Sequence, residues 1–354
     1  MGFDPQREDY ERMGLRQARA LASHDPFSAA RAAVAFGRTL AHNRDSLPQT
    51  DADRAFHLVA EAALAFDYRV GWAPDDEAGE QARRGEARRL LREALELDPE
   101  CHDATRMLLL LSDGVEPREA CEALGDGAES VLASCEARRR EAEAASREDG
   151  RALACDLAMR PYLRWRASQA ECAVAAARYR QALGAARAAL ELDPSDRADA
   201  RMPAYLALAK LEDRDGLERL AGRLAASLSP RHGAEPLLSL CRMAVAWSLG
   251  DVGTASRELE GLVRVPGAGT MLSNPVALSG GTFSHFAFEP GGPDELSDAV
   301  SQATILFDEG RDGRDVGPLA AWTASRGPVL AATLRDELAT GLGELGPDDE
   351  GGEA

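Results

Sequence analysis

Aromatic residues, lysine and long apolar runs are scarce in this sequence of 354 residues. Phe, Trp and Tyr make up only 5% of it, although 45% is hydrophobic. A core must therefore be closed mainly by Ala, Leu and Val, which favours closely packed helices over a β-sandwich. No apolar run approaches the roughly 18 residues of a membrane-spanning helix, and the polar N-terminal segment has no apolar leader. We therefore expect a cytoplasmic protein without a membrane partner.

The charge is strongly one-sided, with 60 acidic residues against 41 basic ones and a formal net charge of −19. Lys210 is the only lysine, so arginine supplies nearly all of the positive charge. A field of this sign repels nucleic acid and anionic membranes. We expect no nucleic-acid partner, and a protein or peptide partner that is basic or apolar. Most charges alternate in sign within helical segments, which is typical of solvated helix faces.

The six cysteines form no CxxC pair and do not resemble the framework of a small secreted protein. They are Cys101, Cys121, Cys135, Cys155, Cys172 and Cys241. The adjacent pair Cys101 and His102 has no second pair at zinc spacing. We therefore expect reduced thiols and no metal site.

Motifs that carry catalysis are missing from the sequence. It contains no P-loop, HExxH, GxSxG or EF-hand pattern, and Gly267-Ala268-Gly269 is a lone GxG with no predicted strand before it. We expect no cofactor and no enzymatic activity.

Helical periodicity runs along most of the chain and predicts an all-α protein. Phe56, Val59 and Ala63 share one helical stripe, and Ala87, Leu91 and Ala94 recur at the same three- and four-residue spacing. The predicted organisation has five parts: N-terminal helical repeats (1–115), a helical connector (116–158), further helical repeats (159–265), a Gly/Pro-rich loop with C-terminal capping helices (266–342), and a disordered acidic tail (343–354).

One pattern occurs twice, as REALELDP ending at Pro99 and RAALELDP ending at Pro194. In each, a helix runs into Leu-Asp-Pro, where the Asp can cap the turn and the Pro prevents the helix from continuing. This resembles the junction between tetratricopeptide repeats. The resemblance implies an α-solenoid of antiparallel helix pairs. The two prolines are 194 − 99 = 95 residues apart, which is not a multiple of the repeat of about 34 residues, so the repeats are irregular.

Residues 160–330 also resemble a group of bacterial tetratricopeptide-type proteins with a Gly/Pro-rich C-terminal extension. The resemblance rests on RPYLR (160–164) as a helix start, Asn274-Pro275, Pro290-Gly291-Gly292 and Ala321-Trp322 followed by Gly327-Pro328. It implies a helical scaffold and supplies no catalytic residue.

The register of the repeats predicts which side chains would line a groove for a partner. These are Arg164, Glu171, Arg201 and Tyr205. The Lys and Asn with which chaperone-binding relatives clamp a peptide carboxylate are replaced by Ala167 and Glu171, so recognition of such a tail is not expected. A protein-interaction scaffold is the function that we expect.

Two alternatives remain open. His285, Phe286 and Glu289, in the Gly-rich segment 266–292, could line a pocket for a small ligand or an enzymatic reaction, although a plug formed by the phenylalanines at the end of the helical array is the simpler interpretation. The chain could also be a regulatory domain of a transcription or signalling system. The sequence does not specify the oligomeric state.

Overall fold

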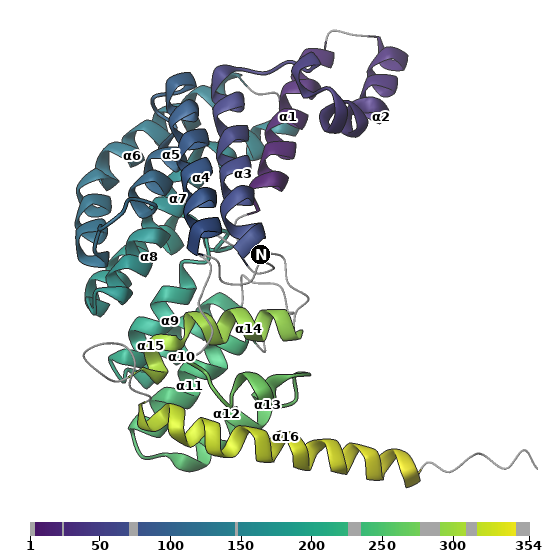
Figure 1. Cartoon of the computed structure of the whole chain (residues 1–354). Coiled ribbons are helices and arrows are strands. Elements are labelled where there is room, and N and C mark those ends of the chain that lie inside the picture. Colours follow the sequence, from purple (N-terminus) through teal and green to yellow (C-terminus); the bar gives the residue numbers. More distant parts are fainter. Residues whose placement is uncertain are drawn as a thin grey trace, which may run out of the picture. The chain divides into compact units, whose positions relative to one another are not determined.

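The computed structural model describes residues 4–22, 25–70, 77–145, 148–225, 235–276, 291–308 and 317–344. These residues are helical or lie in turns and short connections, and no β-strand occurs among them (Figure 1). The prediction of an all-α protein is confirmed for this part of the chain. The chain divides into two compact units, one running to Pro203 and the other beginning at Ala204.

The first unit contains eight of the helices in Figure 1, together with one 3-10 turn. They are α1 (Pro5–Leu21), α2 (Pro26–His42), η1 (Arg44–Ser46), α3 (Asp51–Val70), α4 (Glu77–Leu97), α5 (His102–Leu110), α6 (Pro117–Ala145), α7 (Glu148–Ala175) and α8 (Tyr179–Leu192). The side chains of Asp4 and Asp25 cap α1 and α2, and each cap is followed directly by proline.

Pairs of helices that follow one another pack side by side in this unit, namely α3 with α4, α6 with α7, and α7 with α8. The predicted stripes on α3 and α4 form one core, in which Val59 and Leu91 are fully buried. A second core joins α6 to α7. There the Trp165 indole donates a hydrogen bond to the Leu124 carbonyl at 2.6 Å, and Gly127 leaves room for the indole ring.

Both Leu-Asp-Pro motifs end a helix, as the sequence predicts. The helix α4 stops at Leu97 and α8 stops at Leu192. Asp193 then accepts hydrogen bonds from the backbone amides of Ser195 and Arg197, which fixes the turn. The arrangement of the helix pairs into a solenoid stays a prediction.

The expectation that Arg160-Pro161 opens a helix is wrong. Pro161 lies inside α7, which begins at Glu148, so the expected boundary between 158 and 159 also falls within this helix. Proline cannot donate to the carbonyl of Leu157 one turn earlier. The helix nevertheless continues through this position, where packing of α7 against α6 and α8 compensates for the missing hydrogen bond.

The second unit begins within α9 (Arg201–Lys210) and continues through seven more helices. They are α10 (Arg214–Ala225), α11 (Pro236–Ser248), α12 (Val252–Leu262), α13 (Ala268–Met271), α14 (Pro293–Gln302), α15 (Thr304–Phe307) and α16 (Pro318–Glu344). The central helix is α11, which contacts α10, α12 and α14. Its side chains Leu237, Leu240 and Met243 are almost completely buried, and the Lys210 ammonium donates to the Ile305 carbonyl at 3.3 Å.

None of the described helices combines the length and the apolar character that a membrane span requires. All six cysteines are free thiols, and four of them are buried. The predicted disordered tail (343–354) lies, from residue 345 onward, outside the described residues.

Candidate functional site

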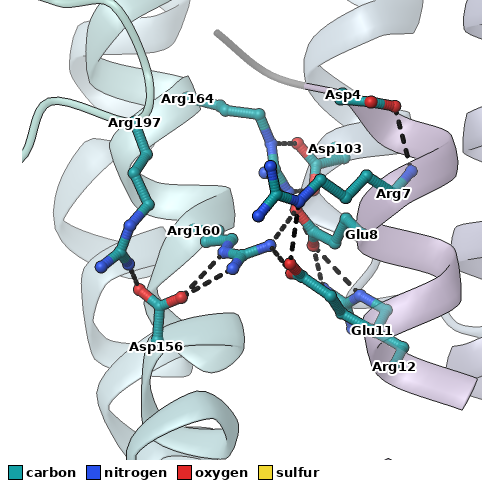
Figure 2. Close-up of polar contacts among 10 residues, drawn as sticks. All are labelled: Asp4, Arg7, Glu8, Glu11, Arg12, Asp103, Asp156, Arg160, Arg164 and Arg197. Atoms are coloured by element: carbon teal, nitrogen blue, oxygen red, sulfur yellow. Dashed lines mark hydrogen bonds and ion pairs between the residues drawn. The ribbon is translucent and has the colours of Figure 1, made fainter. Parts of the chain in front are cut away.

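A cluster of buried charges lies between α1, α5 and α7 in the first unit (Figure 2). At its centre is Arg164, which donates to both carboxylate oxygens of Asp103 at 2.7 and 2.5 Å and to Glu8 at 2.8 Å. These three residues are at most 6% exposed. The guanidinium therefore connects two helices that lie far from α7 in the sequence.

The electrostatics of this centre keep all three groups charged. Burial alone would raise the pKa of Glu8 and Asp103, but the nearby arginines, above all Arg164, outweigh it and lower the pKa of both carboxyls. Burial likewise opposes the charge of Arg164, yet the two carboxylates raise its pKa above the ordinary value. The cluster is therefore a set of fixed charges without a proton to exchange near neutral pH.

Further ion pairs extend from this centre, as Figure 2 shows. Arg12 binds Glu8 at 2.7 Å and stacks over the Phe56 ring at 4.1 Å. Arg160 bridges Glu11 and Asp156 at 2.8 and 2.7 Å. Each carboxylate of the cluster has an arginine partner, and the pairs of Glu8 and Glu11 with Arg160 and Arg164 connect α1 to α7.

Three of the four residues predicted to bind a partner are buried in the structure. Arg164 lies in the buried cluster, while Arg201 and Tyr205 are 3% and 2% exposed. Glu171 is half-buried on α7. Their role in partner binding stays a prediction, and the contacts that the structure gives to Arg164 and Arg201 are internal ion pairs.

Arg201 holds a tight turn between α8 and α9. Its guanidinium pairs with Asp196 at 2.9 Å and also with Asp199. Both aspartates have positive φ angles, 50° and 54°, and the backbone amides of Ala200 and Arg201 donate to Asp196. Burial and the neighbouring Asp199 charge outweigh Arg201 and raise the pKa of Asp196 to about 7.

An open pocket of about 320 Å³ lies on the second unit, where α10, α11 and α12 meet. It combines apolar and charged walls, lined by Arg214, Leu217, Glu218, Arg242, Val245, Thr254 and Glu258. Arg242 binds both carboxylate oxygens of Glu218, at 2.8 and 2.7 Å. Because the pocket opens to solvent, it is a surface that another molecule can reach.

Glu258 is the pocket carboxylate whose charge is least favoured. Burial raises its pKa, and the attraction of Arg242 together with a hydrogen bond from Ser239 only partly offsets this. Glu218, by contrast, has a lowered pKa because Arg242 binds it directly. Spacing along single helices carries no signal for a pocket that three helices form together, so the sequence does not single out these residues.

The candidate loop pocket of His285, Phe286 and Glu289 lies outside the described residues. No group of three or more His, Cys, Asp or Glu side chains suited to a metal ion occurs in the described part of the chain.

Comparison of the chain with protein-family models, with curated proteins and with solved structures finds no match in any of the three. The resemblance to tetratricopeptide repeats therefore rests on the sequence motifs alone.

Proposed function

We propose that this protein is a non-enzymatic helical scaffold that binds a protein or peptide partner through the open pocket on α10, α11 and α12. The observation that carries this proposal is the contrast between the two charged sites. The buried cluster around Arg164 pairs its charges internally and is closed to solvent. The pocket presents charged and apolar groups together on an accessible surface.

The composition of the pocket suits a peptide. Charged side chains such as Glu218 and Arg242 at an opening give orientation and specificity, and the almost completely buried residues Leu217 and Val245 form the apolar part of the lining. A groove between neighbouring helices is also a common place for a helical protein to bind an extended or helical segment.

The test is affinity capture by the tagged protein from lysate of its source cells, comparing wild type with Glu218→Arg. This exposed residue sits at the pocket and pairs with Arg242, so the substitution reverses the charge there without opening the core. Glu260→Arg is the matched control, because Glu260 is exposed on α12 and is not among the residues that line the pocket.

A partner that wild type and Glu260→Arg retain, and that Glu218→Arg loses, is the expected result. Equal retention by all three proteins would show that the partner binds elsewhere. Conversion of a small molecule by the purified protein would refute the non-enzymatic part of the proposal.

A further inference from the structure

The two arginines of the pocket already have carboxylate partners. Arg242 directs two nitrogen donors at Glu218, and Arg214 binds Asp251 at 3.1 Å. An anionic group entering the pocket would have to compete with these ion pairs. The pocket is therefore poorly prepared for a phosphate or a carboxylate ligand.

Glu258 is in the opposite situation. It is half-buried on α12, where Arg242 and Arg257 attract its charge but do not fully offset the effect of burial on its pKa. Arg242 is already bound in a bidentate pair to Glu218. Its hydrogen-bond donor is the neutral hydroxyl of Ser239. A further cation placed directly beside Glu258 in the pocket would therefore supply the charge compensation that the protein itself provides only in part.

The pocket has room for a long cationic side chain. Its apolar lining residues, Leu217 and Val245, are almost completely buried and present little surface themselves. Lysine and arginine combine a long aliphatic stem with a charged head, so such a side chain can reach a half-buried carboxylate through an open pocket. The volume of about 320 Å³ lies at the lower end of the range for ligand pockets, about 300 to 1,000 Å³, which fits one inserted side chain.

The charge of the whole chain favours the same kind of ligand. With a formal net charge of −19, the protein attracts cations at long range and repels anions, which raises the association rate of a basic segment.

We infer that the pocket receives an arginine or lysine side chain of a basic partner segment, with Glu258 as the carboxylate that binds its charged head. This inference rests on the proposed function for the existence of a protein partner. It adds the chemistry of recognition and the residue that provides it.

The test uses a small probe, N-acetyl-arginine amide, titrated into the intact protein while the backbone amide signals of Val245 and Thr254 are followed by NMR. N-acetyl-leucine amide is the uncharged comparison. Glu258→Gln removes the charge at nearly constant shape, and Glu260→Gln is the matched control on the exposed face of the same helix.

We expect saturable shifts with the arginine probe, a loss of affinity of about tenfold in Glu258→Gln, which corresponds to about 1.4 kcal/mol, and a change of less than about twofold in Glu260→Gln. Equal affinity of wild type and Glu258→Gln would overturn the inference, as would equal binding of the leucine probe.

The two proposals fail separately. If Glu218→Arg loses a captured partner but wild type does not bind the arginine probe, the scaffold proposal stands and cation recognition by Glu258 is refuted. Probe binding that depends on Glu258, without any captured partner, would support the pocket chemistry and refute the scaffold.

Discussion

Replacing Arg164 by methionine should destabilise the first unit severely. The substitution keeps much of the side-chain volume but removes the cation that binds Asp103 with two hydrogen bonds and Glu8 with another. Breaking a buried ion pair by removing one partner typically costs about 3–5 kcal/mol, because a buried charge is left uncompensated. Some compensation remains in the variant, because Glu8 keeps Arg12 at 2.7 Å and Asp103 keeps Arg106 at 3.5 Å. The lower half of the range, about 3 kcal/mol, is therefore expected.

The assay is thermal unfolding followed by circular dichroism. In a unit of this size, a loss of about 3 kcal/mol lowers Tm by roughly 6–12 °C. Arg7→Ala serves as the control, since Arg7 forms an exposed ion pair on α1, and exposed pairs of this kind contribute little. Its Tm should stay within about 2 °C of wild type.

The pH dependence of Tm tests whether the ionised carboxylates cause this loss of stability. In wild type, the lowered pKa of Glu8 and Asp103 means that their contribution to stability is present above about pH 4, near the ordinary carboxyl values, and is lost as the pH falls through the folded-state values. The difference in Tm between wild type and Arg164→Met should therefore be largest at neutral pH and shrink below about pH 4. A difference that is independent of pH, or a Tm equal to that of wild type at pH 7, would show that the cluster does not hold its carboxylates in the ionised state.

Three further predictions concern packing, thiols and the turn before α9. Gly127→Ala should destabilise the protein by about 1–3 kcal/mol, because the new Cβ would lie 2.7 Å from the Trp165 ring. Gly184→Ala, with no atom within 4 Å of its Cβ, should stabilise it by about 0.5–1 kcal/mol in chemical denaturation; equal effects of the two would contradict the packing argument. Burial raises the pKa of the Cys241 thiol far above its usual range, so this thiol should resist iodoacetamide at pH 8 until the protein is denatured, and rapid native labelling would refute its burial. The pKa of Asp196, raised to about 7, gives stability that is complete below about pH 4 and is lost as the pH rises through 7. Asp196→Asn should flatten the fall in the urea midpoint between pH 5 and 8, and an unchanged slope would disprove the assignment.

Local signals in the sequence predict the helices of this protein well. The stripe of Ala87, Leu91 and Ala94 becomes a buried face of α4, and both Leu-Asp-Pro motifs end helices. These features depend on residues within one or two turns of each other. The prediction at Pro161 is wrong because it also uses only nearby residues. Proline is common at the start of a helix, but here packing of α7 against its neighbours keeps the helix intact.

The functional residues depend on distant parts of the chain and are harder to predict. Arg164 matches a groove position by register, but its carboxylate partners are 156 and 61 residues away, at Glu8 and Asp103. Nothing near Arg164 in the sequence reveals them. The pocket around Glu258 likewise requires three helices to be brought together, which periodicity along any one of them does not describe.

The attachment of α1 to α7 also sets an order of events during synthesis. Glu8 is made early, but Arg164 follows 156 residues later, which at about 5–20 residues per second is a delay of roughly 8–30 s. Until then Glu8 has Arg12 of its own helix at 2.7 Å but lacks Arg160 and Arg164. Helix α1 can pack on α3 before that, but it should gain its full protection from hydrogen exchange on the ribosome only after α7 has been made.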